Sequence, residues 1–261
     1  MISWQERLLT MLFPRKCPIC SALCEPGRGA RLCGACEERL QRELSQRCPV
    51  CGERAPECRC LPALVREAGL DHVSAGFYDP GKRDSATSQL VFALKRSQDD
   101  APARIFSMLL APAVMRVLAV RGENVRDWTF VYPPRSAEAL SRYGFDQAKR
   151  LAVFCAHATG AEYASLLVRH GGAVQKKLSA SERQENASAS FCLRRRAGCQ
   201  GKKYIVIDDI MTSGATAVRC AELLLRCGAS DVIAATPLKT LPRKSGKRMT
   251  EANEPWFADA Q

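Results

Sequence analysis

The chain has 261 residues, of which 46% are apolar and 25% are charged. This length suits one or two domains, and the composition excludes a wholly disordered chain. No uninterrupted apolar stretch reaches the ~20 residues that a transmembrane helix needs, so no membrane span is predicted. Lys and Arg number 39 against 27 Asp and Glu. The resulting net charge of +12 favours polyanionic partners such as nucleic acid, phosphorylated metabolites or an anionic membrane surface.

The first seventeen residues form a short amphipathic run. This run lacks a long apolar centre and a small-residue cleavage site, so it is not interpreted as a signal peptide. We therefore expect a cytoplasmic protein. In that reducing compartment, clustered cysteines indicate metal binding and not disulfides.

Nine of the fourteen cysteines lie between residues 17 and 60. Eight of them form three CxxC pairs and one CxC pair: Cys17 and Cys20, Cys33 and Cys36, Cys48 and Cys51, and Cys58 and Cys60. A CxxC turn can place two thiolates on one tetrahedral zinc, and two such turns complete a four-cysteine site. The pattern predicts two structural Zn2+ ions, with no ligand position left open for catalysis.

The simplest pairing is sequential, with residues 17–36 on one zinc and residues 48–60 on the other. An interleaved pairing stays open from the sequence alone. Cys24 is the leftover cysteine, and we do not expect it to be a ligand. We place a double zinc-ribbon-like module at residues 1–62, because about sixty residues with little apolar material need such a metal to fold.

Alternating strand and helix patterns begin near residue 63 and predict an α/β domain over residues 63–241. Helical spacing predicts helices over 85–97, 101–120, 145–159 and 215–227, with Ser85 as a cap and Pro112 as a kink. Apolar runs predict strands over 128–132, 164–168, 204–207 and 231–236. The continuously apolar run at 204–207 is typical of a parallel strand that is covered on both faces. We therefore expect a parallel sheet with helices on both faces.

The strand at 204–207 is followed by two adjacent carboxylates, Asp208 and Asp209, and then by a loop of small residues that enters the next helix. The loop contains Met211, Thr212, Ser213, Gly214, Ala215 and Thr216. Ligands bind at the carboxyl ends of parallel strands. Backbone N–H groups at a helix N-terminus can hold a phosphate, and carboxylates can accept hydrogen bonds from sugar hydroxyls. The pattern indicates a site for a ribose 5-phosphate.

Residues 204–216, YIVIDDIMTSGAT, resemble the signature of the type I phosphoribosyltransferase family. The resemblance implies the substrate phosphoribosyl pyrophosphate (PRPP), with a Mg2+ ion that bridges diphosphate oxygens. It also implies a catalytic role for Asp208 and Asp209 and ligand contacts from the loop. Positioning and electrostatics would then carry phosphoribosyl transfer, because the diphosphate leaves readily once it is bound.

Over roughly residues 15–240, the chain resembles the ComF family of competence-associated proteins, which join an N-terminal zinc module to a phosphoribosyltransferase-like domain. The segment Val131 to Arg135 resembles the family's Val-Pro-x-Pro segment, with Tyr132 where the first proline is usual. The run around Arg142 resembles Arg-Gly-Phe-Asn-Gln, with Tyr143 inserted and Asp146 in place of the Asn. Further matches fall at Lys95, Gln175, Leu178, Arg183, Asn186 and Phe191.

Four basic residues within these matches are candidate ligands for the phosphates of PRPP: Lys95, Arg135, Arg142 and Arg183. No base-recognition element is evident, so the acceptor of the phosphoribosyl group stays unknown. The ComF resemblance also implies a role in DNA uptake during natural transformation.

A second hypothesis is a non-catalytic accessory protein that binds single-stranded DNA and acts with a competence helicase. It rests on the net charge of +12, on the zinc module and on the ComF resemblance. The basic residues 242–261 are interpreted as a solvated, flexible tail. A third option is a zinc-stabilised scaffold without a small ligand.

Overall fold

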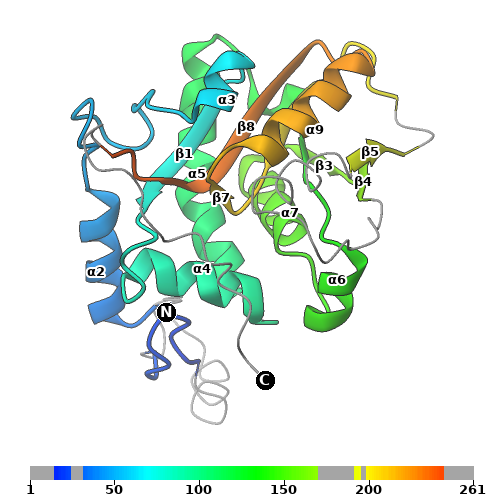
Figure 1. Cartoon of the computed structure of the whole chain (residues 1–261). Coiled ribbons are helices and arrows are strands. Elements are labelled where there is room, and N and C mark those ends of the chain that lie inside the picture. The colour runs from blue at the N-terminus through cyan, green and yellow to red at the C-terminus, as the bar shows by residue number, and fades with distance from the viewer. Residues whose placement is uncertain (1–14, 25–31, 170–190, 195–197, 244–261) are drawn as a thin grey trace, which may run out of the picture.

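A parallel sheet forms the centre of the computed structural model, which describes residues 15–24, 32–169, 191–194 and 198–243 (Figure 1). Its main path runs β1–β8–β6–β2–β3, and β7 pairs with the end of β8. The strands are β1 (His72–Tyr78), β2 (Trp128–Val131), β3 (Glu162–Ala164), β6 (Lys203–Ile207), β7 (Ile210–Met211) and β8 (Asp231–Thr240). All of these pairings are parallel.

Helices cover both faces of this sheet, as predicted. Behind the sheet in Figure 1 lie α5 (Ala101–Val120) and α7 (Gln147–Thr159), and in front lie α9 (Ala215–Arg226) and α3 (Ala63–Glu67). Two hydrophobic clusters result. One joins Ile205 and Ile207 of β6 to α5 and α7, and the other joins Val206 to α9. Alternate residues of β6 thus pack against helices on opposite faces of the sheet, and this explains why residues 204–207 are all apolar.

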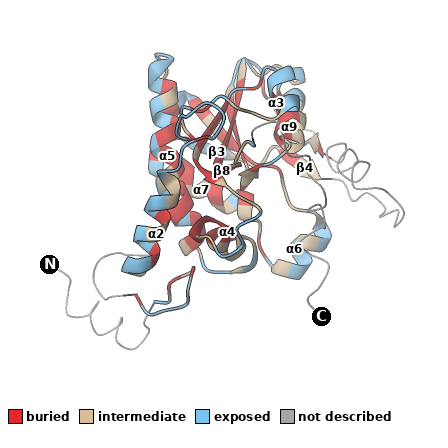
Figure 2. Cartoon of the chain, turned by 60° about the vertical axis from the view of Figure 1, so that its left-hand side comes forward, coloured by how far each residue is buried: buried red, intermediate tan, exposed pale blue. Residues whose placement is uncertain are grey.

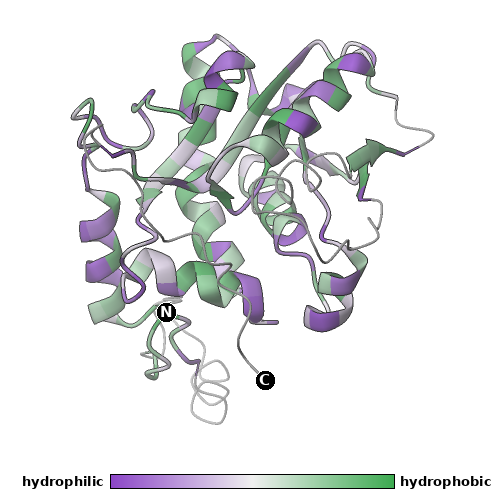
Figure 3. Cartoon of the chain, in the orientation of Figure 1, coloured by the Kyte–Doolittle hydropathy of each residue, from purple (hydrophilic) through white to green (hydrophobic). Residues whose placement is uncertain are grey.

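Local signals in the sequence set the helix ends. Ser85 is the N-cap of α4 (Ala86–Arg96), where its side chain accepts a hydrogen bond from the N–H of Ser88. Gly144 and Gly160 adopt left-handed conformations at the C-termini of α6 (Ala137–Tyr143) and α7. Figure 3 shows that hydrophobic residues gather in the sheet and on the helix faces toward it. The predicted helices over 85–97, 101–120, 145–159 and 215–227 are confirmed within two residues at each end.

Helix α5 is long and apolar enough by length and composition to cross a membrane, although Arg104 and Arg116 interrupt its apolar sequence. Half of its most apolar window is buried inside the structure, and it contacts β1, β8 and α7 (Figure 2). This burial is typical of the core helix of an α/β domain, whose apolar face covers a sheet.

Two predicted strands differ from the structure. The expected strand at 164–168 is wrong, because residues 162–164 form β3 and residues 167–169 form β4 (Leu167–Arg169). Strand β4 leaves the sheet and pairs antiparallel with β5 (Phe191–Leu193). The strand predicted at 231–236 continues to Thr240, passing through Pro237. Strand β1 was not predicted, because His72, Ser74 and Gly76 interrupt its apolar pattern.

The cysteine-rich segment packs directly on the α/β fold. Its helix α2 (Gly34–Leu44) places Cys36 and Leu40 in the same hydrophobic cluster as α4 and α5. Cys48 and Cys58 pack with Phe77 of β1. The Nζ of the buried Lys239, on β8, donates a hydrogen bond to the carbonyl oxygen of Cys58. The division at residue 62 stays a prediction, and the basic tail predicted at 242–261 lies almost wholly outside the described residues.

Candidate functional site

A cavity of about 230 Å3 opens at the end of β6, beside Thr236 of β8 and the start of α9. Its lining contains the two acidic residues and the whole predicted loop: Asp208, Asp209, Met211, Thr212, Ser213, Gly214, Ala215 and Thr216. Lys95, at the end of α4, lines the same cavity. The structure therefore brings together nine of the residues that the sequence singled out.

The two carboxylates follow the C-terminal end of β6 and lie in different environments. Asp209 is buried and Asp208 is half-buried. The N–H of Asp209 donates a 2.8 Å hydrogen bond to Oδ1 of Asp208. The Nζ of Lys95 lies 3.1 Å from Oδ2 of Asp209. One acid of the pair is thus neutralised by a resident cation, and the other is not.

The protonation of these groups follows from their surroundings. Burial and the charge of Asp209 raise the pKa of Asp208 to about 8. Burial opposes the charge on Lys95, but the Asp209 carboxylate outweighs this effect and raises the pKa of Lys95. At pH 7 the site therefore contains a Lys95–Asp209 ion pair beside a mostly protonated Asp208.

This raised pKa predicts how stability varies with pH. The unfolded state releases the Asp208 proton near pH 4 and the folded state near pH 8, so stability falls across this interval. We expect Asp208→Asn to reduce this pH dependence. Relative to the wild type, the variant's free energy of unfolding should be about 1–3 kcal/mol larger at pH 8.5 than at pH 5. Urea unfolding of both proteins at the two pH values measures the difference. Parallel pH profiles would contradict the assignment.

The loop depends on the conformation of Gly214, the N-cap of α9. Its φ of +81° lies in the left-handed region, and an added Cβ would collide with the side chain of Val65 on α3. The first N–H groups of α9 point out of the helix end toward this loop, because an α-helix leaves its first turn without internal partners. A glycine at this position therefore allows the loop to pack closely against α3 at the edge of the cavity.

Two of the other basic candidates, Arg135 and Arg142, are not among the described residues that line the cavity. The guanidinium of Arg135 donates to the backbone oxygens of Phe145 (3.1 Å) and Lys95 (2.9 Å). It also stacks on the rings of Tyr143 and Phe145. Its observed contacts therefore hold the end of α4. Arg142 is exposed in the last turn of α6, and Arg183 lies outside the described residues.

Sequence reasoning missed three residues of the lining: Ile210, Ala217 and Thr236. Thr236 lies in β8, where the Nε2 of the buried His72 is 2.8 Å from its hydroxyl, and that hydroxyl donates to the carbonyl of Leu238. The signal that could have found Thr236 is its place near the end of a predicted parallel strand, beside Asp208 on the next strand.

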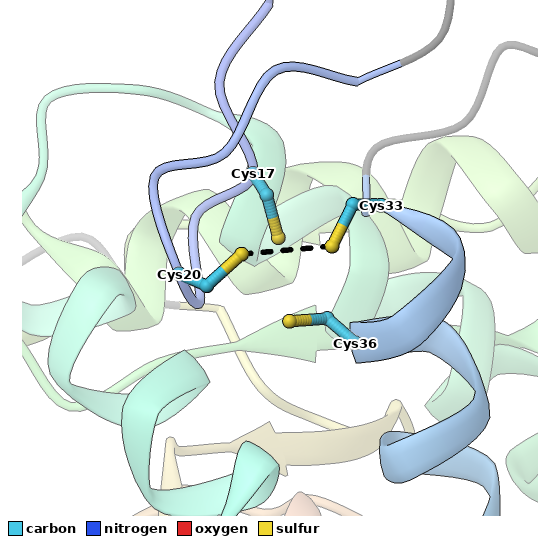
Figure 4. A group of neighbouring side chains, drawn as sticks. All are labelled: Cys17, Cys20, Cys33 and Cys36. Carbon is cyan, nitrogen blue, oxygen red and sulfur yellow. Dashed lines mark hydrogen bonds between the residues drawn. The ribbon is translucent and has the colours of Figure 1, made fainter.

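The eight paired cysteines form two groups that could each hold a metal ion. The sulfurs of Cys17, Cys20, Cys33 and Cys36 lie within 4.8 Å of one another, and so do those of Cys48, Cys51, Cys58 and Cys60. Figure 4 shows the first group converging on one point, with two sulfurs from a loop and two from the start of α2. A tetrahedron with Zn–S bonds of about 2.3 Å has S–S edges of about 3.8 Å, so these separations fit a four-cysteine site.

The geometry supports the sequential pairing of these ligands, and Cys24 belongs to neither group. The first CxxC turn of each group has the same backbone hydrogen bond: the carbonyl oxygens of Cys17 and Cys48 each accept an N–H from the residue four positions later. Those residues, Ser21 and Gly52, both have positive φ. Such matching turns are typical of metal-binding knuckles.

One thiol in each group ionises easily. The pKa of Cys20 is lowered to about 7, chiefly by a hydrogen bond from the N–H of Ala22. Burial opposes ionisation of Cys48, but N–H groups of Cys51 and Val50 outweigh it and lower the pKa of Cys48 to about 7. Thiolates are the form in which cysteine binds metal, and the lowered pKa values favour that form at Cys20 and Cys48.

Known proteins resemble this chain over most of its length. Residues 136–258 match the phosphoribosyl transferase domain family. DNA utilization protein YhgH of Salmonella typhimurium is 30% identical over 206 residues, which cover 77% of this chain and 87% of that protein. Competence protein ComFC of Streptococcus pneumoniae is 26% identical over 77% of this chain and 84% of that protein. A hypoxanthine-guanine phosphoribosyltransferase structure from Bacillus anthracis is 15% identical, with a TM-score of 0.34, over 59% of this chain and 77% of that chain.

The matched domain contains β6, the acidic pair and the loop that enters α9, and the match to YhgH spans most of both chains. The fold is thus a type I phosphoribosyltransferase-like sheet preceded by cysteine clusters that could hold metal. The chain belongs to the ComF family of competence and DNA-utilization proteins, which it had resembled by sequence.

Proposed function

We propose that the cavity binds PRPP together with Mg2+. The loop from Thr212 to Thr216 and the start of α9 would hold the 5-phosphate through backbone N–H groups. Asp208 and Asp209 would accept hydrogen bonds from the ribose hydroxyls. Lys95, which lines the same cavity and pairs with Asp209, would supply a positive charge for the diphosphate.

A Mg2+ ion would enter with the ligand, and its chemistry is to neutralise and bridge diphosphate oxygens. The residues present suit this role, because a Mg2+ site of this kind needs few protein ligands beyond substrate oxygens and water. Asp208 and Asp209, the two acidic residues in the cavity lining, would hold this ion directly or through water. The half-buried Asp208 would lose its proton as the cation arrives, since a positive charge favours the ionised carboxylate.

We propose further that bound PRPP can pass its phosphoribosyl group to an acceptor. The bond from C1 to the diphosphate oxygen breaks, the diphosphate takes the electron pair, and the acceptor's lone pair forms the new bond at C1. The adjacent carboxylates would stabilise the positive charge that develops on the ribose ring. The acceptor is not identified by any residue of the cavity.

We propose that both cysteine clusters hold structural Zn2+. Four thiolates complete a tetrahedral site and leave no position for substrate, and cysteine sulfur is a preferred ligand of zinc. The packing of both clusters against the α/β fold agrees with a structural role.

The observation that carries the PRPP proposal is a single cavity lined both by an acidic pair at a strand end and by a glycine loop at a helix start. Isothermal titration of the full chain with PRPP in the presence of Mg2+ tests it. We expect saturable one-to-one binding that weakens when EDTA replaces Mg2+. The proposal would be overturned if the titration shows no binding heat at protein concentrations high enough to detect a millimolar Kd.

A second candidate function is binding of single-stranded DNA beside a competence helicase. The net charge of +12 favours it, and relatives carry the names competence protein and DNA utilization protein. We expect a fluorescent oligonucleotide to bind with an affinity that falls steeply between 50 and 200 mM salt, because binding releases counterions, by roughly tenfold or more. Absence of binding at low salt would exclude this function.

A further inference from the structure

The helix that carries two thiols of the first cysteine cluster also contacts the helix that carries Lys95. Cys33 is the N-cap of α2, and Cys36 lies in its first turn. Cys36, Leu40 and Glu43 follow at spacings of four and three, so they share one face of α2. Cys36 and Leu40 are buried in the main hydrophobic cluster. This face therefore turns toward the α/β fold, and Figure 1 shows α2 beside α4.

Glu43 lies at the C-terminal end of this face, and its carboxylate accepts three hydrogen bonds from the start of α4. Its Oε1 accepts the N–H of Ala86 at 2.7 Å, and its Oε2 accepts the N–H of Thr87 at 2.8 Å. The Thr87 hydroxyl donates to Oε2 at 2.9 Å. The helix dipole also favours a carboxylate at the N-terminus of α4.

The first turn of α4 is then fully satisfied. The side chain of Ser85 accepts the N–H of Ser88, and the N–H of Ser85 itself donates to the carbonyl of Lys82. An α-helix leaves four such groups without internal partners, and here each of the four has an acceptor. Glu43 provides two of these acceptors from a different part of the chain, so it fixes where α4 begins relative to α2.

The far end of α4 delivers Lys95 to the cavity. Nine residues separate Ala86 from Lys95, which is a rigid length of about 14 Å along the helix. Buried Leu90, Val91 and Leu94 hold the helix between these points. Because a helix moves as one body, a shift at its start is transmitted to the 3.1 Å contact between Lys95 and Asp209.

We propose that Glu43 is a positioning residue for Lys95, and that it connects the first cysteine cluster with the candidate ligand cavity through α2 and α4. The importance of this connection for ligand binding rests on the proposed function. The connection itself does not, and it can be measured without any ligand.

The ligand-free test measures the reactivity of Lys95 in the full, metal-loaded chain. Acetylation by an N-hydroxysuccinimide ester, followed by mass spectrometry, gives the rate at Lys95 relative to the exposed Lys149. We expect Glu43→Gln to raise this ratio several-fold, because a loosened α4 exposes the amine more often. Glu38→Gln, on the exposed side of α2, removes the same charge and should leave the ratio unchanged.

Two outcomes of this test would overturn the proposal. The first is an unchanged ratio in Glu43→Gln while circular dichroism shows a native fold. The second is an equal rise in Glu38→Gln, which would assign the effect to the lost charge alone. Cys20→Ser, in which the exposed sulfur is lost from the first cluster, should raise the ratio as well. An unchanged ratio there would overturn the link to the cluster.

A double-mutant cycle then tests the effect on the ligand. Glu43→Gln should weaken Mg-PRPP binding by about fivefold to fiftyfold, the usual range of coupling between sites. In a Lys95→Met background the same change should have an effect below about twofold, because its target is gone. Equal effects in both backgrounds would overturn the positioning role. If the wild-type chain does not bind Mg-PRPP, the proposed function fails and the acetylation result still decides this inference.

Discussion

Asp209→Asn and Asp208→Asn are each expected to weaken Mg-PRPP binding by about 10- to 100-fold, because each replaces a charged acceptor of ribose hydroxyls by a neutral amide. Asp209→Asn should have the larger effect. Its carboxylate is the more buried of the two, and it is the one that pairs with Lys95. Removing that carboxylate also releases Lys95 from its position beside the cavity. Isothermal titration at fixed Mg2+ measures both effects.

The matched control for these changes is Asp84→Asn, which removes the same charge from an exposed position before α4. It should bind as the wild-type chain does. Thermal unfolding of each variant separates a lost ligand contact from a lost fold, because amide and carboxylate have nearly the same shape. Wild-type affinity in both cavity variants would exclude the acidic pair from the ribose site.

Cys20→Ser and Cys51→Ser are each expected to lower the zinc content from two ions to one per chain. Both sulfurs belong to clusters but are exposed, so their replacement costs little packing. Zinc binding contributes about 10–16 kcal/mol in isolated zinc-finger peptides. Only part of this binding free energy adds to the stability of a larger chain. At about 2–4 °C per kcal/mol, we expect Tm to fall by about 10 °C or more.

Elemental analysis of the purified chain counts the metal, and thermal unfolding measures the loss. Cys192→Ser, at a half-buried cysteine outside both clusters, should keep two zinc ions and a Tm near that of the wild type. A wild-type chain that contains no metal after purification in its presence would contradict the zinc proposal. So would unchanged zinc content in both cluster variants.

Much of the site could be predicted because its signals are local. The apolar run before Asp208 indicates a buried strand, and the glycine after Thr212 and Ser213 indicates a turn into a helix. Each pattern occupies a few consecutive residues, and the ligand edge of a parallel sheet follows from the fold rules alone. The CxxC and CxC spacing predicted the four cysteine pairs in the same way, and the sequential grouping was the simpler of the two pairings that the sequence left open.

The remaining features depend on contacts between distant residues. Arg135 matched a family segment, but spacing cannot show that its guanidinium contacts the carbonyls of Phe145 and Lys95. Strand β1 contains the buried His72, whose Nε2 contacts the hydroxyl of Thr236, more than a hundred residues away. Pattern reasoning treats such a polar residue as a reason against a buried strand.

The place of β1 in the sheet has a consequence for how the chain is made. Register pairs His72 with Ala234, so β1 joins the sheet only through β8; these are the first and the last strands of the described residues. Until synthesis passes residue 240, β1 presents an unpaired edge, and such edges invite association with other chains. Folding during translation should therefore wait on the carboxyl-terminal strand, and a ribosome stalled before it would present an aggregation-prone nascent chain.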